Sequence, residues 1–144
     1  MQKIINYKMI EYPLLWEEIF KVRFEVFVKE QNVPIELERD EYDKKSYHMA
    51  VIENDIIIGT LRVYIDNKKA KIGRVALIKE KRGQKIGKEM MKKAIEFSKS
   101  KKVQKIVLDS QTYIEKFYSD LGFISYGDIF MDAGIPHIHM EMAL

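Results

Sequence analysis

The stretch from Tyr47 to Lys99 constrains the fold more than any other part of this 144-residue chain. It holds three runs typical of β-strands and then one long amphipathic helix. The runs are separated by the short turns Asn54-Asp55 and Asp66-Asn67-Lys68, so we expect successive antiparallel strands. Their ranges are Tyr47–Glu53, Ile56–Ile65 and Ala70–Ile78. The helix is Gln84–Lys99, with an apolar stripe of Ile86, Met90, Ala94 and Phe97 and lysines opposite.

The flanking segments complete a mixed architecture. A short first strand at Lys3–Met9 leads to a helix that begins after Pro13 and ends before Pro34. Downstream, a strand–helix–strand unit follows the antiparallel meander. The expected fold class is therefore α/β (α+β): a mixed, mostly antiparallel central sheet with helices on both faces. The remaining expected elements are Ile35–Lys45 (loop or short helical turn), Lys105–Leu108 (strand), Tyr113–Leu121 (helix), Phe123–Ser125 and His137–Met142 (strands).

Composition narrows the classes of protein that fit. The length suits one domain, which we expect to span 1–144 without a linker. The chain has no cysteine, which excludes disulfides, thiolate metal sites and a cysteine nucleophile. It has neither an apolar run near the about 20 residues that span a membrane nor the start of a secretory signal. We therefore expect a cytoplasmic protein that does not bind membranes.

Charge is unevenly distributed along the chain. Between Lys79 and Lys105 there are eleven Lys or Arg and three Glu, whereas Glu36–Asp43 holds five acids and one Arg. The basic region could attract a phosphate-bearing ligand, and the acidic one a cationic acceptor. Solvated surface is the alternative for both. Binding of nucleic acid is not expected, because no helix-turn-helix or exposed aromatic platform accompanies the basic helix.

The segment Val75–Lys88 carries the strongest chemical signal. A strand ends, a basic loop with two glycines follows, and a long helix begins. The start of a helix offers backbone N–H groups that lack internal partners, and it carries a partial positive charge. Glycine permits close approach of the backbone, so the arrangement suits a pyrophosphate, although a plain connection is the alternative. The segment matches neither the P-loop nor the dinucleotide GxGxxG pattern.

Here the chain resembles the GNAT acetyltransferase superfamily, whose signature is [QR]-x-x-G-x-[GA]. The match lies at Arg82 and Gly87, while Lys85 stands where the family has glycine. The resemblance implies acetyl-CoA as cosubstrate. It also implies that the strand before the loop splays from its neighbour, so that the backbone of Val75, Ala76 and Leu77 binds the pantetheine arm. The pyrophosphate would lie against Arg82, Gly83, Gln84, Lys85, Ile86, Gly87 and Lys88.

Three further segments extend this resemblance over nearly the whole chain. Gln111–Phe123 is similar to the superfamily's FY-x-x-x-GF helix, and we expect Gln111, Phe117 and Tyr118 to contact acetyl-CoA. The other two resemble the ElaA/YjcF-like subgroup, with its R-x-E-V-F-V-x-E-Q and G-I-P-H-x-x-M patterns. They are Arg23–Pro34 and Asp132–Met140.

Tyr118 is the predicted general acid. Many enzymes of this superfamily place a tyrosine at this position. A phenol with a pKa of about 10 could protonate a leaving thiolate whose conjugate acid titrates at about 8.5. The alternative is a core tyrosine that packs beside Phe117 and Leu121.

Glu30 is the first candidate for the general base that deprotonates the incoming amine, with Asp109 and His137 as substitutes. Glu30 shares a predicted helix face with Arg23 and Phe27, and the resemblance implies that the end of this helix borders the acceptor site. We therefore expect the acceptor to contact Arg23, Phe27, Glu30 and His137. Arg23 lies among apolar residues, so an ion pair with Glu30 or with an acid of Glu36–Asp43 is as plausible as substrate recognition. His137 and His139 lack a third ligand in the sequence, and no metal site is expected.

The predicted function is transfer of an acetyl group from acetyl-CoA to a primary amine of an unidentified small molecule or peptide. The alternative is a non-catalytic acyl-CoA sensor or interaction module. The C-terminal strands could form the edge of a homodimer.

Overall fold

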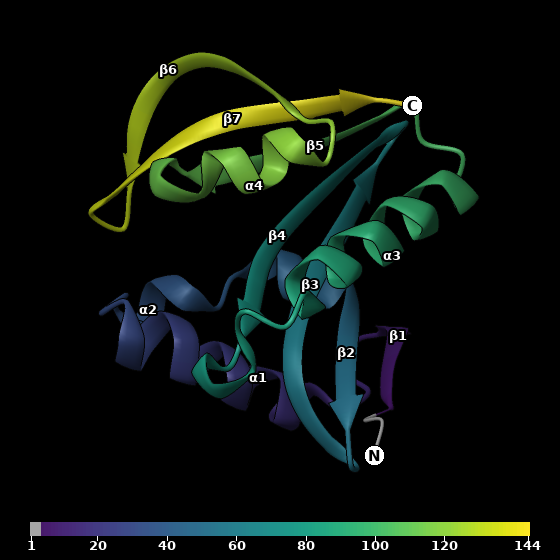
Figure 1. Ribbon diagram of the computed structural model, residues 1–144, viewed down its shortest axis with the longest axis vertical. Coiled ribbons are helices and arrows are strands. Elements are labelled where there is room, and N and C mark those ends of the chain that lie inside the picture. The colour runs from purple at the N-terminus through teal and green to yellow at the C-terminus, as the bar shows by residue number, and fades with distance from the viewer. Residues whose placement is uncertain (1–3) are drawn as a thin grey trace.

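A computed structural model of the protein describes residues 4–144. It contains one seven-stranded sheet with the order β1-β2-β3-β4-β5-β7-β6, which confirms the expected mixed, mostly antiparallel fold (Figure 1). Neighbouring strands pair antiparallel except β4 and β5, which pair parallel. The strands are β1 (Ile5–Glu11), β2 (Tyr47–Glu53), β3 (Ile56–Asp66), β4 (Lys69–Leu77), β5 (Lys105–Gln111), β6 (Ile124–Asp132) and β7 (Ile135–Ala143).

The helices cover both faces of the sheet. Helix α3 (Ile86–Ser100) and helix α4 (Glu115–Asp120) contribute to the main core on one face. On the other face, α1 (Trp16–Arg23) continues into a π-helical segment, η1 (Phe24–Glu30), and both pack on β4 through a smaller cluster of Val22, Val26 and Ala76. Short connections are α2 (Ile35–Glu38) and the 3₁₀ turns η2 (Glu41–Lys45), η3 (Lys79–Lys81) and η4 (Thr112–Ile114).

The main core follows the periodicities read from the sequence. Met90 and Ala94 on α3 are fully buried against Leu61 and Ile72 of the sheet, while lysines line the outer side of the helix. Burial of each large apolar side chain stabilises the fold by about 1.5–3 kcal/mol.

An ion-pair cluster holds the acidic segment against the sheet. Arg23 is fully buried and donates to Glu38 Oε1 at 2.5 Å and to Asp43 Oδ1 at 2.8 Å. Arg62 and Arg74 bind Asp40 from the neighbouring strands. Glu38, Asp40 and Asp43 therefore act in the fold, which argues against the expectation that this segment binds a cationic acceptor.

Several element boundaries differ from the sequence-based expectations. Strand β1 lies two residues further along the chain, and Lys3 lies outside the described residues. Strand β6 continues to Asp132, whereas the expected strand stopped at Ser125. Gly127 and Asp128 resemble a turn in the sequence, but they belong to a bulge between the paired residues Tyr126 and Phe130.

Candidate active site

The sheet opens between β4 and β5. These strands pair only over three positions, from Lys69↔Lys105 to Lys71↔Val107. Beyond them β4 keeps pairing with β3, through a bulge in which Arg74 and Val75 oppose Leu61 alone. The bulge turns Val75 and Leu77 toward the α3 side and Ala76 toward η1. Val75, Ala76 and Leu77 thus follow the point where β5 leaves β4, as the family resemblance implied.

The start of α3 faces this opening from the loop after β4. The first backbone hydrogen bond of the helix runs from Glu89 N–H to Lys85 O at 3.2 Å. Within the described chain, the N–H groups from Gly83 to Lys88 have no recorded protein acceptor. Consecutive free N–H groups at a helix start form a site for an anion. Gly83 and Lys85 both adopt positive φ, +80° and +64°, and so shape the loop.

Arg82 connects this loop to η1. Its guanidinium donates to both carboxylate oxygens of Glu30, at 2.5 and 2.8 Å, and its Nε donates to Leu77 O at 3.0 Å. The hydrogen bonds from Arg82 lower the pKa of the Glu30 carboxyl. A carboxyl with a lowered pKa is a weaker base, so this pairing disfavours the predicted role of Glu30 as general base.

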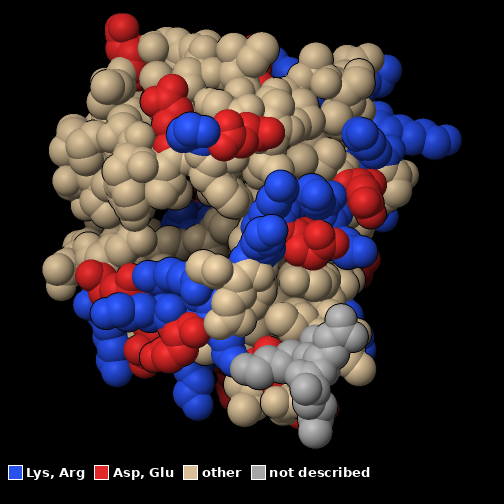
Figure 2. Space-filling model, in the orientation of Figure 1, with Lys and Arg blue, Asp and Glu red and all other residues tan. Residues whose placement is uncertain are grey.

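The end of η1 also reaches β5. Gln31, which follows Glu30, accepts a hydrogen bond of 2.9 Å from the side-chain amide of Gln111. Gln111 is the last residue of β5. Two adjacent residues therefore bridge the two sides of the opening, Glu30 toward the β4–α3 loop and Gln31 toward β5. In the same orientation as Figure 1, the space-filling view shows a hollow between the upper and lower parts of this face (Figure 2).

Tyr118 lies on α4 with its ring in the main core. It is 6% exposed and contacts Phe117 and Phe123 edge-on. Burial raises the pKa of Tyr118 to about 12. Its hydroxyl has no recorded hydrogen bond and is not among the fully enclosed polar atoms, so the exposed fraction includes the hydroxyl. Phe117 lies next to the start of α3, since a Cβ added at Gly87 would be 3.8 Å from its ring.

The predicted acceptor residues occupy different places. Phe27 packs with the small cluster on β4, whereas Arg23 belongs to the buried ion-pair cluster, a placement that disfavours substrate binding. His137 is on β7, and its Nδ1 donates to Ile135 O at 2.7 Å. Asp109, the substitute base, accepts a bond of 2.5 Å from His139 Nδ1. The sequence predicted that both histidines lie on one face of a strand. The pairing of His139 with Asp109 could not be predicted, because it depends on the register between β5 and β7.

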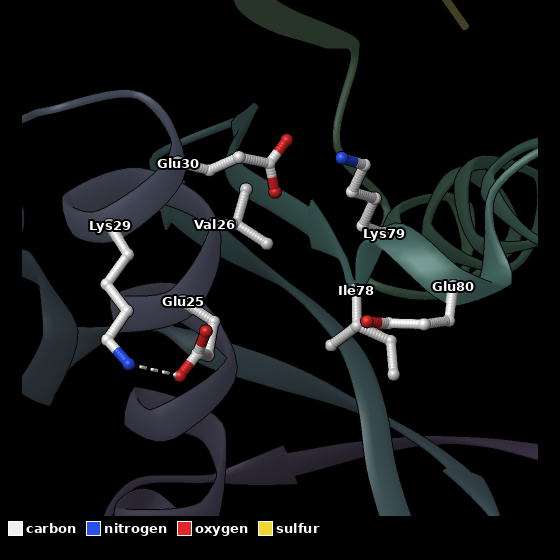
Figure 3. Close-up of a pocket in the computed structure, with 7 residues that line it drawn as sticks. All are labelled: Glu25, Val26, Lys29, Glu30, Ile78, Lys79 and Glu80. Carbon is white, nitrogen blue, oxygen red and sulfur yellow. Dashed lines mark hydrogen bonds and ion pairs between the residues drawn. The ribbon is translucent and has the colours of Figure 1, made fainter.

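A shallow cavity of about 410 Å³ lies between η1 and the η3 turn (Figure 3). Glu25, Lys29 and Glu30 line it from η1, opposite Lys79 and Glu80 of the η3 turn. It lies beside the Arg82–Glu30 pair, and Tyr118 is not among its lining residues. Across residues 4–144 no group of three or more His, Asp or Glu is placed to hold a metal ion. No helix in that range is long and apolar enough to cross a membrane.

Comparisons with known proteins agree with this geometry. Residues 15–144 match the family model described as the acetyltransferase (GNAT) domain. The chain is 34% identical over 125 residues to the uncharacterized N-acetyltransferase YjcF of Bacillus subtilis, covering 86% of this chain and 89% of that protein. It is 31% identical to the protein ElaA of Escherichia coli over 127 residues, covering 85% and 83%.

Solved structures are similar over almost their whole length. The crystal structure of Escherichia coli ElaA has a TM-score of 0.88 at 26% identity, covering 96% of this chain and 99% of that one. An acyl-CoA N-acyltransferase from Pseudomonas aeruginosa has a TM-score of 0.88 at 22% identity, covering 97% and 100%, and shows the same fold.

Proposed function

Because the chain belongs to the GNAT acetyltransferase family, in the subgroup of ElaA and YjcF, we propose that it transfers an acetyl group from acetyl-CoA to a primary amine. Acyl transfer is the chemistry of this family, and acyl-CoA is its cosubstrate. The membership confirms the family resemblance of the sequence motifs.

One observation carries the proposal: the free N–H groups at the start of α3 lie directly after the part of β4 that has left β5. If the N–H groups of Gly83–Lys88 bind the pyrophosphate, the pantetheine arm would lie along the backbone of Val75–Leu77. The partial positive charge of the helix start and the lysines at 85 and 88 favour an anion there. Chemically the site therefore fits both the charged and the amide-rich parts of coenzyme A.

Arg82 is the residue we assign to exchange partners when the cosubstrate binds. It is held by Glu30 and by Leu77 O, at the junction of the two proposed contacts. A guanidinium binds phosphate in the same forked geometry as a carboxylate, so phosphate oxygens can replace Glu30. Glu30 would then hold Arg82 in position in the free protein.

Tyr118 is the proposed proton donor to the departing sulfur. Its raised pKa keeps the hydroxyl protonated at neutral pH, and it also makes the phenol a weaker acid than an exposed tyrosine. The hydroxyl therefore first stabilises the negative charge that develops on sulfur by a hydrogen bond. The proton moves only when that charge has built up.

Thiol release tests this function. Acetyl-CoA is mixed with spermidine, kanamycin or a lysine-containing peptide, and amine-dependent release of the free thiol is followed. We expect Tyr118→Phe to reduce kcat by about 10²-fold, the usual contribution of one proton donor. Tyr47→Phe is the matched control, because that ring packs on Phe97 of α3 and should leave turnover unchanged.

Two other results would redirect the proposal. Unchanged turnover of Tyr118→Phe across the whole pH range removes the role of Tyr118. Stabilisation by acetyl-CoA, with no thiol release from the wild type for any amine, points to an acyl-CoA sensor.

A further inference from the structure

Four aromatic rings form a continuous stack on the face of β6 and β7 away from the main core. The rings come alternately from the two strands, in the order Tyr126, His139, Phe130, His137. Successive ring centroids are 5.5, 4.4 and 5.8 Å apart, and neighbouring planes differ by 22° to 28°. His139 is therefore held between Tyr126 and Phe130, and its imidazole has little freedom to rotate.

Asp109 fixes the protonation pattern of that imidazole. In register, Asp109 of β5 lies opposite His139 of β7, and its Oδ1 is 2.5 Å from Nδ1. A carboxylate accepts, so Nδ1 carries the hydrogen and Nε2 of the neutral ring is left with its lone pair. Nε2 has no recorded protein partner in the described chain, and the side chain is 43% exposed. A histidine oriented by a carboxylate, with its second nitrogen free, is arranged to accept a proton.

This pair lies where the sheet opens. Val107 is the last residue of β5 that pairs with β4, and Asp109 is the next residue on the same face. Lys71, the partner of Val107, reaches Asp109 Oδ2 at 3.2 Å from β4. One step further, Gln111 is bridged to the end of η1. The pair thus lies beside the vertex of the opening, on the face of the sheet opposite Tyr118.

Resting on the proposed function, we propose that His139 is the general base for the acceptor amine and that Asp109 is its positioning residue. The ammonium of the acceptor gives one proton to Nε2, and Asp109 stabilises the resulting imidazolium. The neutral nitrogen forms a bond to the thioester carbonyl carbon, and the carbon–sulfur bond breaks. Tyr118 gives its proton to sulfur and is restored by the second proton of the attacking nitrogen, while His139 releases its proton to water.

Several other ionisable groups lie near His139. Asp109 is hydrogen-bonded to it, with Lys71 bound to the far side of that carboxylate. The others are Tyr126 on β6, His137 on β7, and Glu141 on β7 with its partner Lys105. A test must therefore separate the proton transfer from these neighbours.

The tautomer can be measured without turnover. The chain has only three histidines, so long-range ¹H–¹⁵N correlation spectra can assign each ring. At pH 8 we expect His139 with hydrogen on Nδ1 and none on Nε2, and Asp109→Asn to weaken that preference. Hydrogen on Nε2 of His139 in the wild type would overturn the proposal, because no lone pair would remain for the amine.

Kinetics then test the base itself. At pH 7 we expect His139→Gln to lower kcat/KM for the amine by 10²–10³-fold and Asp109→Asn by about tenfold. The loss should shrink to less than tenfold at pH 9.5, because solution then supplies neutral amine. If His139→Gln had instead damaged the fold, raising the pH to 9.5 would not restore the rate. Glu141→Gln, on the same face of β7, should match the wild type. His137→Gln should change the KM for the amine, but its rate should still fall at low pH as the wild-type rate does.

Chemical rescue provides a second variant. His139→Ala would leave a ring-sized gap between Tyr126 and Phe130 with Asp109 at its side. Added imidazole should therefore raise the rate of this variant at least tenfold. Full activity of His139→Gln at pH 7, or an equal loss at pH 7 and 9.5 without rescue, would refute the role of His139. Failure of the wild type to release thiol would instead refute the proposed function.

Discussion

At the scale of single residues, the contact between Glu30 and Arg82 matters most for the proposed cosubstrate site. The pair joins η1 to the loop before α3, and Arg82 cannot give both of its terminal nitrogens to phosphate while Glu30 holds them. The two side chains are 36% and 40% exposed, so the pair itself stabilises the protein by at most about 1 kcal/mol. That is small enough for an incoming pyrophosphate to displace Glu30.

The first prediction concerns this exchange. Glu30→Gln should lower the KM for acetyl-CoA, by up to about fivefold, because the competing carboxylate is lost. Steady-state kinetics with varied acetyl-CoA would measure it. Glu25→Gln is the matched control, since Glu25 is an exposed acid of the same helix that pairs with Lys29. A fall of kcat by 10²-fold with KM unchanged would instead return Glu30 to the role of general base.

Sequence reasoning reached individual residues unevenly. It pointed to Arg82 through the family signature, which is a local pattern at a glycine-rich helix start. It could not choose a partner for Arg23, because Glu38 and Asp43 reach it only after the chain folds back. His139 was recognised as sharing a face with His137, but its partner Asp109 is 30 residues away and depends on the β5–β7 register.

At the scale of elements, the loop before α3 shows how a departure from a family pattern is accommodated. Lys85 occupies the position where the family has glycine, and it adopts the left-handed conformation that glycine favours, with φ +64°. A non-glycine residue there costs roughly 1–2 kcal/mol, offset in part by the greater entropy that glycine loses on folding. The sequence revealed the mismatch, but not that the loop would keep the glycine geometry.

We therefore predict that Lys85→Gly stabilises the free protein, by up to about 1 kcal/mol in urea unfolding. The same substitution at Lys88, three residues later inside the helix, should destabilise it by about 1 kcal/mol. Equal destabilisation by both variants would show that Lys85 is not strained.

Element boundaries were predictable where periodicity was long, as in α3 and the three central strands. They failed at the bulged β6, because a glycine and an aspartate inside a strand resemble a turn. The helix after Pro13 was also predictable, but its change to π-helical pitch at Phe24 was not. That change separates Arg23 and Glu30, which an α-helical spacing would place on one face.

At the scale of the whole molecule, the sheet consists of two parts joined by a short parallel contact. Strands β1–β4 carry α1, η1 and α3, while β5–β7 carry α4, and in the described sheet β4 and β5 pair at three positions (Figure 1). The opening between them separates Tyr118 on one face from Asp109 and His139 on the other. Fold class and family could be predicted from the sequence because they depend on element order and local motifs. The placement of the proposed acid and base on opposite faces could not be predicted, because it depends on packing across the sheet.

The most direct test of the account is thermal unfolding with and without acetyl-CoA. At 100 times its dissociation constant a ligand that binds only the folded state adds about 2.7 kcal/mol, which for a chain of this size raises Tm by roughly 9 °C. We predict this rise for the wild type and a smaller one for Arg82→Ala at the same concentration. No change in Tm at millimolar acetyl-CoA would contradict the proposed cosubstrate site and everything inferred from it.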